Sequence, residues 1–120
     1  MAPPRVVVLA DDVIWSTRLV AAVRSAGAEA IAVRSLDALE HQLTAVGARV
    51  VVDLTARSYD GIAAVAAASG LGAGVLAVGQ HDDVALRKRA LAAGASRVLA
   101  YRKLADDGPR TIAAWLAATP

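Results

Sequence analysis

The chain has 120 residues, of which 57% are hydrophobic and 3% aromatic, and its formal net charge is +2. This length predicts a single domain over residues 1–120, and the absence of phenylalanine predicts a core of valine, leucine, isoleucine and alanine. The lack of cysteine excludes disulfides, thiolate metal sites and a cysteine nucleophile, and no apolar run approaches the roughly 18 residues that span a membrane.

The first half of the chain predicts three strands separated by two helices. Arg5–Leu9 is an uninterrupted apolar run, which is typical of a strand covered on both faces, as in a parallel sheet. A helical pattern follows over Val13–Ala26, then a short strand at Ala30–Val33 and a helix over about Ser35–Val46. The third strand contains Val50–Val52, three β-branched residues in a row that favour an extended chain.

The second half alternates helices with two further strands. An alanine-rich helix is predicted over Ile62–Ala68, and the glycine-rich segment after it indicates a flexible loop. A fourth strand is predicted at Val75–Val78, followed by a helix over Val84–Ala93. The fifth strand is predicted at Val98–Tyr101, and a last helix over Pro109–Ala118, because proline suits the first turn of a helix.

Strands and helices that alternate through short connections predict a parallel sheet with right-handed crossovers. The expected fold class is α/β, a flavodoxin-like doubly wound five-stranded sheet in the order 2-1-3-4-5, with helices on both faces. In this order the first and third strands are neighbours, and ligands of such sheets bind outside the carboxyl ends of the strands. Asp11 and Asp12 follow the first strand and Asp53 ends the third, so the three carboxylates should meet in one crevice.

Three carboxylates in one crevice repel one another, and a hard divalent cation between them would make the arrangement tolerable. The residues therefore favour a metal site at Asp11, Asp12 and Asp53. They leave open the alternative that these are solvated loop carboxylates and that Asp53 caps a local turn.

With these motifs the chain resembles the receiver domain of two-component response regulators over nearly its whole length. Receiver domains carry an acidic pair after the first strand, matched here by Asp11-Asp12, and an aspartate after the third strand, matched by Asp53. They usually place Asp-Gly seven and eight residues further on, matched by Asp60-Gly61, and Gly-Ala before the fifth strand, matched by Gly94-Ala95.

The resemblance implies that Asp53 accepts a phosphoryl group from a phosphohistidine in a phosphorelay. It also implies that Asp11, Asp12 and Asp53, with the backbone carbonyl of Thr55, hold Mg²⁺, which bridges to that phosphoryl group. No other cofactor is expected. The implied partner is a histidine kinase or another signalling protein, and the domain itself is not expected to be an enzyme.

Four positions depart from the receiver pattern. Receivers end the fourth strand with Thr or Ser and the fifth with Lys, which contact the phosphoryl group, whereas this chain has Gly79 and Tyr101 there. The aromatic switch position of the fifth strand is Val98, and the proline four residues beyond the acceptor is Arg57. A charged hydrogen bond to a phosphoryl oxygen contributes about 1.5–3 kcal/mol. Shifting the equilibrium between an inactive and an active conformation from about 1:99 to 99:1 needs ~5.5 kcal/mol of differential stabilisation. Chemistry at Asp53 could therefore persist while the conformational switch is weakened or absent.

A basic cluster on the fourth helix and fifth strand is a second candidate surface. Its members are Arg87, Lys88, Arg89, Arg97 and Arg102. The default interpretation is a solvated face, and the alternative is a docking patch for an acidic partner or for a second copy of the chain. Nucleic acid is not favoured, because the chain has no helix-turn-helix pattern and few aromatic residues to stack bases. No membrane contact is expected, and the absence of an N-terminal signal segment predicts a cytoplasmic protein.

Three functions are consistent with these patterns. The first is a receiver-like signalling module, an atypical or pseudo-receiver, that acts mainly by protein–protein contact with a weakened or absent phosphorylation switch. The second is a response regulator phosphorylated at Asp53 with Mg²⁺. The third is a small-ligand-binding or enzymatic domain on the same fold, with Tyr101 occupying its crevice. The fold alone does not separate them, because it hosts many functions.

Overall fold

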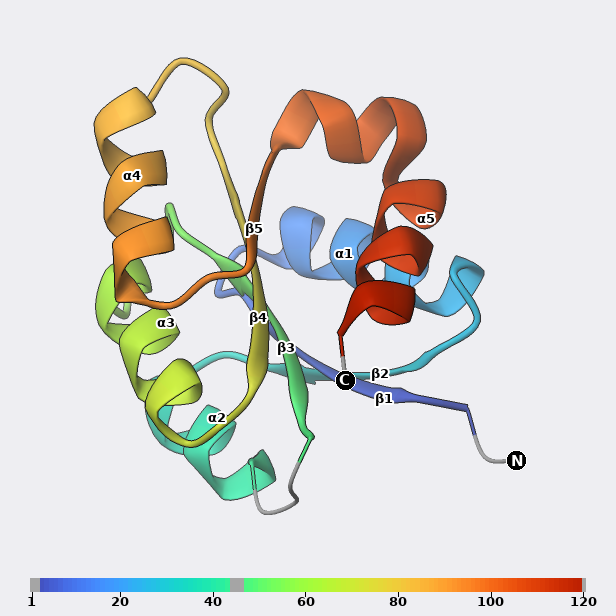
Figure 1. Ribbon diagram of the computed structural model, residues 1–120, viewed down its shortest axis with the longest axis horizontal. Coiled ribbons are helices and arrows are strands. Elements are labelled where there is room, and N and C mark those ends of the chain that lie inside the picture. The colour runs from blue at the N-terminus through green and yellow to red at the C-terminus, as the bar shows by residue number, and fades with distance from the viewer. Residues whose placement is uncertain (1–2, 44–46, 120) are drawn as a thin grey trace.

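The computed structural model describes residues 3–43 and 47–119, which form a five-stranded parallel sheet covered by helices on both faces (Figure 1). The strands are β1 (Arg5–Leu9), β2 (Glu29–Val33), β3 (Arg49–Asp53), β4 (Gly74–Gly79) and β5 (Arg97–Ala100). The helices are α1 (Val13–Ser25), α2 (Leu36–Gln42), α3 (Gly61–Gly70), α4 (Val84–Ala93) and α5 (Tyr101–Ala118). The sheet order is β2-β1-β3-β4-β5, which confirms the predicted fold class. No helix in the described ranges is long and apolar enough to cross a membrane.

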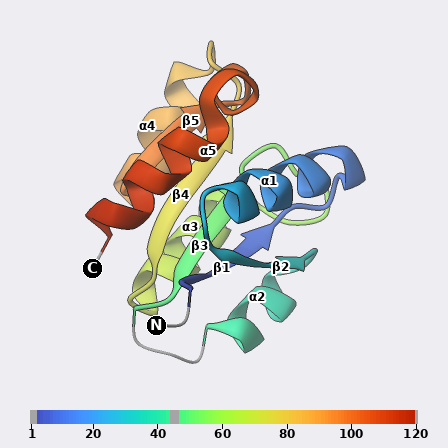
Figure 2. The ribbon, with the colours of Figure 1, turned by 90° about the vertical axis from the view of Figure 1, so that its right-hand side faces the viewer.

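Successive side chains of the central strands point to opposite faces of the sheet, so the core has two layers. Val6 and Val8 of β1 pack in the layer under α1 and α5, whereas Val7 and Leu9 pack in the layer under α2, α3 and α4. Figure 2 shows α1 and α5 together on one side of the sheet and α2 on the other. Because both faces are covered, every side chain from Val6 to Leu9 is buried, which explains the uninterrupted apolar run.

Aspartate side chains cap the beginnings of α1, α3 and α4. Asp60 Oδ1 accepts hydrogen bonds from the backbone N–H groups of Ile62 and Ala63, at 3.0 and 3.1 Å, and so caps α3. Glycine is needed at the next position, because a Cβ atom on Gly61 would lie 2.8 Å from the backbone of Leu54. The Asp-Gly pair thus places the first turn of α3 directly against the loop that follows β3.

The last strand and helix differ from the sequence-based expectation. The predicted strand Val98–Tyr101 ends at Ala100, because β5 pairs with β4 only as far as the partners Gly79 and Ala100. The helix begins at Tyr101 instead of Pro109, and a break at Asp107 (φ −151°, ψ 32°) separates its two segments. The second helix ends at Gln42, and residues 44–46 of its predicted extension lie outside the described residues.

Candidate functional site

A hollow of about 570 Å³ lies at the carboxyl ends of the central strands. Its lining residues are Asp11, Asp12, Trp15, Asp53, Thr55, Arg57, Gln80 and Tyr101. The structure therefore brings the three carboxylates that the sequence singled out into one hollow. Tyr101 enters it as well, because α5 begins directly at the end of β5.

Asp53 is the buried carboxylate of this hollow, with a relative exposure of 1%. Its Oδ1 atom accepts hydrogen bonds from the backbone N–H of Thr55 at 3.2 Å and from the Thr55 hydroxyl at 3.1 Å. The Tyr101 hydroxyl donates a third hydrogen bond to the same oxygen. Burying a carboxylate is costly unless it is hydrogen-bonded, and these three donors offset that cost without a cation.

Tyr101 is held in place by its ring as well as by its hydroxyl. The ring is buried and packs against the Trp15 indole of α1, with centroids 4.1 Å apart and planes tilted by 33°. Burial first, and then the hydrogen bond to Asp53, raise the pKa of Tyr101 above its ordinary value of 10.0. The phenol therefore stays protonated at neutral pH and acts as a neutral donor to Asp53.

The two residues of the acidic pair have different partners. Asp11 Oδ2 accepts hydrogen bonds from the backbone N–H groups of Arg57 and Ser58, at 2.9 and 2.8 Å. The bond from the Ser58 backbone is the main reason that the pKa of Asp11 is lowered. Asp12 Oδ1 accepts from the backbone N–H of Trp15 at 3.0 Å and caps α1.

The contact between Arg57 and Asp11 depends on one of the departures from the receiver pattern. A proline at position 57 would have no backbone N–H and could not donate to Asp11. The non-proline residue thus allows the loop after β3 to hold the Asp11 carboxylate. The contact with Asp11 thus depends on the backbone N–H of Arg57 and not on its side chain.

Tyr59 is a site residue that the sequence analysis missed. Its hydroxyl lies 3.1 Å from the carbonyl oxygen of Leu9 and 2.7 Å from that of Asp53, so it bridges the ends of β1 and β3. Burial first, and then the negative charge of Asp53, raise the pKa of Tyr59. The only sequence signal was an aromatic residue beside the helix-capping Asp60.

The carboxylates have the hard oxygen atoms that Mg²⁺ prefers, but their present arrangement does not fit a bound ion. Within residues 3–43 and 47–119, no group of three His, Asp or Glu side chains is placed to hold a metal. Asp11 and Asp12 are each engaged by backbone N–H groups, and Asp53 by Thr55 and Tyr101. Each of these hydrogen bonds reaches a single carboxylate oxygen, which is Oδ2 of Asp11, Oδ1 of Asp12 and Oδ1 of Asp53.

Gly79 and Val98, two of the departures from the receiver pattern, lie at the end of β4 and within β5. Gly79 is the last residue of β4, and a Cβ atom there would make an ordinary contact of 3.4 Å with Leu54 Cδ1. Val98 is buried in the core layer under α3 and α4. Neither supplies a polar group to the hollow, so Tyr101 is the polar residue on this side that reaches Asp53.

The basic residues of the proposed docking patch are exposed. They are Arg87, Lys88 and Arg89 on α4, Arg97 at the start of β5 and Arg102 in the first turn of α5. Beside them on α5, Asp107 pairs with Lys103 at 3.5 Å and with Arg110 at 3.7 Å. The structure thus leaves these five cations at the surface and neutralises part of the neighbouring acidic charge.

No protein-family model and no curated protein match this chain. Solved structures do match. A two-component system response regulator/GGDEF domain protein aligns with TM-score 0.83 and 21% identity over 98% of this chain and 50% of its own. A Burkholderia pseudomallei response regulator with a phosphorylated aspartic acid and a calcium ion aligns with TM-score 0.76 and 20% identity, over 98% and 66% of the two chains.

The beryllofluoride-activated NtrC4 receiver domain dimer aligns with TM-score 0.79 and 18% identity, over 97% of this chain and 98% of its own. The chain therefore spans nearly all of this receiver domain but only about half to two thirds of the two longer response regulators. At these identities the likeness concerns the backbone and not the site chemistry. The chain has the fold of response-regulator receiver domains.

Proposed function

We propose that this chain is a receiver-like signalling module of a two-component system that acts mainly by protein–protein contact, with a weakened or absent phosphorylation switch. The receiver fold and the buried Asp53 at the end of β3 support the first part of the proposal. The observation that carries the second part is the hydrogen bond from the Tyr101 hydroxyl to Asp53 Oδ1.

The position of Tyr101 explains why a switch would be weak. A phosphoryl group on Asp53 would add negative charge to a hollow that already contains Asp11 and Asp12. A lysine at position 101 could neutralise part of that charge, whereas a phenol offers only a neutral hydrogen bond. Gly79 offers no hydroxyl. Each missing charged hydrogen bond is worth about 1.5–3 kcal/mol. Phosphorylation would therefore stabilise an altered conformation less than in a receiver that has both groups.

A second function, phosphorylation of Asp53 in the manner of an ordinary response regulator, is favoured by a specific feature. The three hydrogen bonds to Asp53 within the described residues all reach Oδ1, and none reaches Oδ2. Asp53 also lines the open hollow of about 570 Å³. Oδ2 of Asp53 is thus free of these hydrogen bonds, although Gly79 supplies no hydroxyl and Tyr101 no cation to a phosphorylated product.

The partner surface proposed for this module is the exposed face of α4, β5 and the first turn of α5. Its basic residues fit an acidic partner protein, such as a histidine kinase or another signalling protein, or the acidic side of a second copy. The structurally similar NtrC4 receiver domain is a dimer, which supports testing self-association here.

The test is to treat the protein with acetyl phosphate and Mg²⁺, and then to measure intact mass and backbone amide spectra. The proposal expects slight phosphorylation, absent in Asp53→Asn, with amide shifts confined to the hollow and none in α4 or β5. Efficient phosphorylation with shifts throughout α4, β5 and α5 would instead establish the second function.

A further inference from the structure

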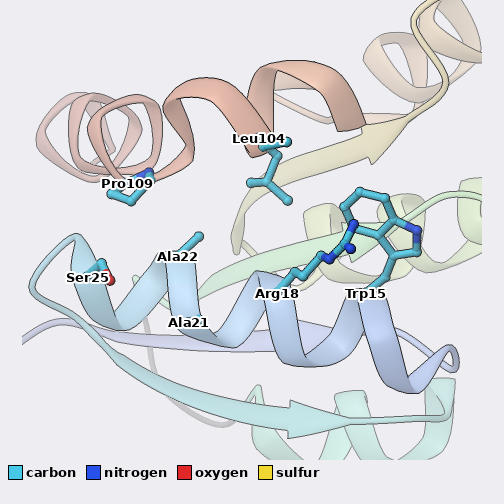
Figure 3. Close-up of a pocket in the computed structure, with 8 residues that line it drawn as sticks. Trp15, Arg18, Ala21, Ala22, Ser25, Leu104 and Pro109 are labelled. Carbon is cyan, nitrogen blue, oxygen red and sulfur yellow. The ribbon is translucent and has the colours of Figure 1, made fainter.

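A second hollow, of about 460 Å³, lies between α1 and α5 (Figure 3). It is lined by Trp15, Arg18, Ala21, Ala22, Ser25, Leu104, Ala105 and Pro109. A volume of roughly 300–1,000 Å³ is usual for small-molecule sites, which are mostly apolar with a few polar groups that orient the ligand. This groove has that size and that composition.

The apolar walls of the groove follow from the local sequence. Ala21 and Ala22 on α1 are too small to fill the space opposite α5, where Leu104 points into it (Figure 3). Leu104 and Pro109 lie on the two segments of α5, on either side of the break at Asp107. The break therefore shapes the groove, because it lets both segments contribute to one wall.

Arg18 gives the groove its charge. Its guanidinium carbon lies 5.1 Å from the centroid of the Trp15 ring, a cation–π contact that orients the group. Across the part of the chain that the structure describes, Arg18 forms no ion pair and no side-chain hydrogen bond, and no acidic residue lines the groove. A guanidinium held in this way has its donors available for a carboxylate or a similar anion.

We propose that the groove between α1 and α5 binds a small amphipathic anion, with its apolar body against Ala21, Ala22 and Leu104 and its anionic head on Arg18. This site is separate from Asp53 and does not depend on the proposed signalling function. Trp15 lines both hollows, so the ligand would contact the residue that packs against Tyr101.

The test uses octanoate as the probe and the two indole N–H signals of the protein as reporters. Octanoate should shift the Trp15 indole signal with millimolar affinity and leave the buried Trp115 signal in place, since Trp115 lies outside the groove. Octylammonium, which has the same chain length and the opposite charge, should bind at least about tenfold more weakly, because it repels Arg18.

Matched variants separate the site from general surface binding. Arg18→Gln should weaken octanoate binding about tenfold, whereas Arg24→Gln, an exposed position on the same helix, should leave it unchanged. Ala21→Leu should fill the groove and abolish binding, and Ala113→Leu on the exposed face of α5 should not; both are helix-compatible changes. Equal binding of octylammonium, equal loss in the two arginine variants, or no shift at Trp15 would overturn the proposal.

Discussion

The two sides of the hollow at the carboxyl edge of the sheet use their polar groups in different ways. On the β1 and β3 side, the carboxylates of Asp11, Asp12 and Asp53 are all present, and all are hydrogen-bonded by the protein itself. On the β4 and β5 side, Gly79 contributes no side chain, and Tyr101 reaches across to Asp53. The buried Asp53 carboxylate is therefore stabilised by neutral donors from Thr55 and Tyr101, although Arg57 also lines the hollow.

Tyr101 connects the two sides, so removing its side chain should have the largest effect. Tyr101→Ala deletes a buried ring that packs on Trp15 and also removes a donor from the buried Asp53. Loss of a large buried aromatic side chain typically costs about 3–5 kcal/mol of unfolding free energy. Urea denaturation should show this loss. The control is Arg102→Ala at the exposed neighbouring position, whose unfolding free energy should stay within about 0.5 kcal/mol of the parent. Equal stability of the Tyr101→Ala variant would mean that the ring contributes no packing.

The hydroxyl alone can be tested with Tyr101→Phe, which keeps the ring and its contact with Trp15. Leaving a buried acceptor with one donor fewer should cost about 1–3 kcal/mol. A double-mutant cycle with Asp53→Ala should give a coupling energy of about 0.5–3 kcal/mol, because each change removes the same hydrogen bond. Additive effects of the two changes would show that Tyr101 and Asp53 do not interact in solution.

The protonation of the phenols offers a pH-dependent test of the same bond. The chain has two tyrosines, and burial raises the pKa of both in the folded state. A raised folded-state pKa favours the protonated phenol, so its stabilising contribution is complete below the unfolded value of 10.0 and is lost as the pH rises through the folded value. Tyrosinate absorbance should therefore appear only well above pH 10.0 in the folded protein, and stability should decline over that range less steeply in Tyr101→Phe. If the tyrosinate absorbance of the folded protein reached half of its maximum at pH 10.0, the pKa of the unfolded chain, the buried and hydrogen-bonded position of both rings would be contradicted.

The smallest expected effect concerns the acidic side and its metal affinity. The parent should bind Mg²⁺ weakly, with a change in Trp15 fluorescence only at millimolar concentration, because Asp11 and Asp12 are engaged by backbone N–H groups. Arg57→Pro removes one N–H donor to Asp11 and should tighten Mg²⁺ binding by up to about tenfold, whereas Arg57→Ala, which keeps the N–H, should not. Equal responses of the two variants would show that the Arg57 backbone does not restrain Asp11.

Sequence patterns were sufficient for the sheet order and most helices, because buried parallel strands appear as apolar runs such as Arg5–Leu9. They placed Asp11, Asp12 and Asp53 at one edge, because strand order determines which strand ends meet. They placed Tyr101 at the crevice but assigned it to the fifth strand, since an apolar run does not show that the pairing of β5 with β4 ends at Gly79 and Ala100. The hydrogen bonds from Tyr101 to Asp53 and from Tyr59 to the Leu9 carbonyl join residues far apart in sequence, so they leave no local pattern.

Restoring the missing groups tests most directly the claim that this is a receiver scaffold without its phosphate-sensing side. Gly79→Thr returns a hydroxyl to the end of β4, where a Cβ atom fits at 3.4 Å from Leu54, and Tyr101→Lys returns a cation at the start of α5. The measurement is the shift in melting temperature on adding beryllofluoride with Mg²⁺, since ligand binding to the folded state raises it. The double variant should respond more than the parent, and each single variant should give less than half of the gain, because both groups contact the same oxygens. A parent that responds as strongly as the double variant would contradict the account, as would a folded double variant that does not respond at all.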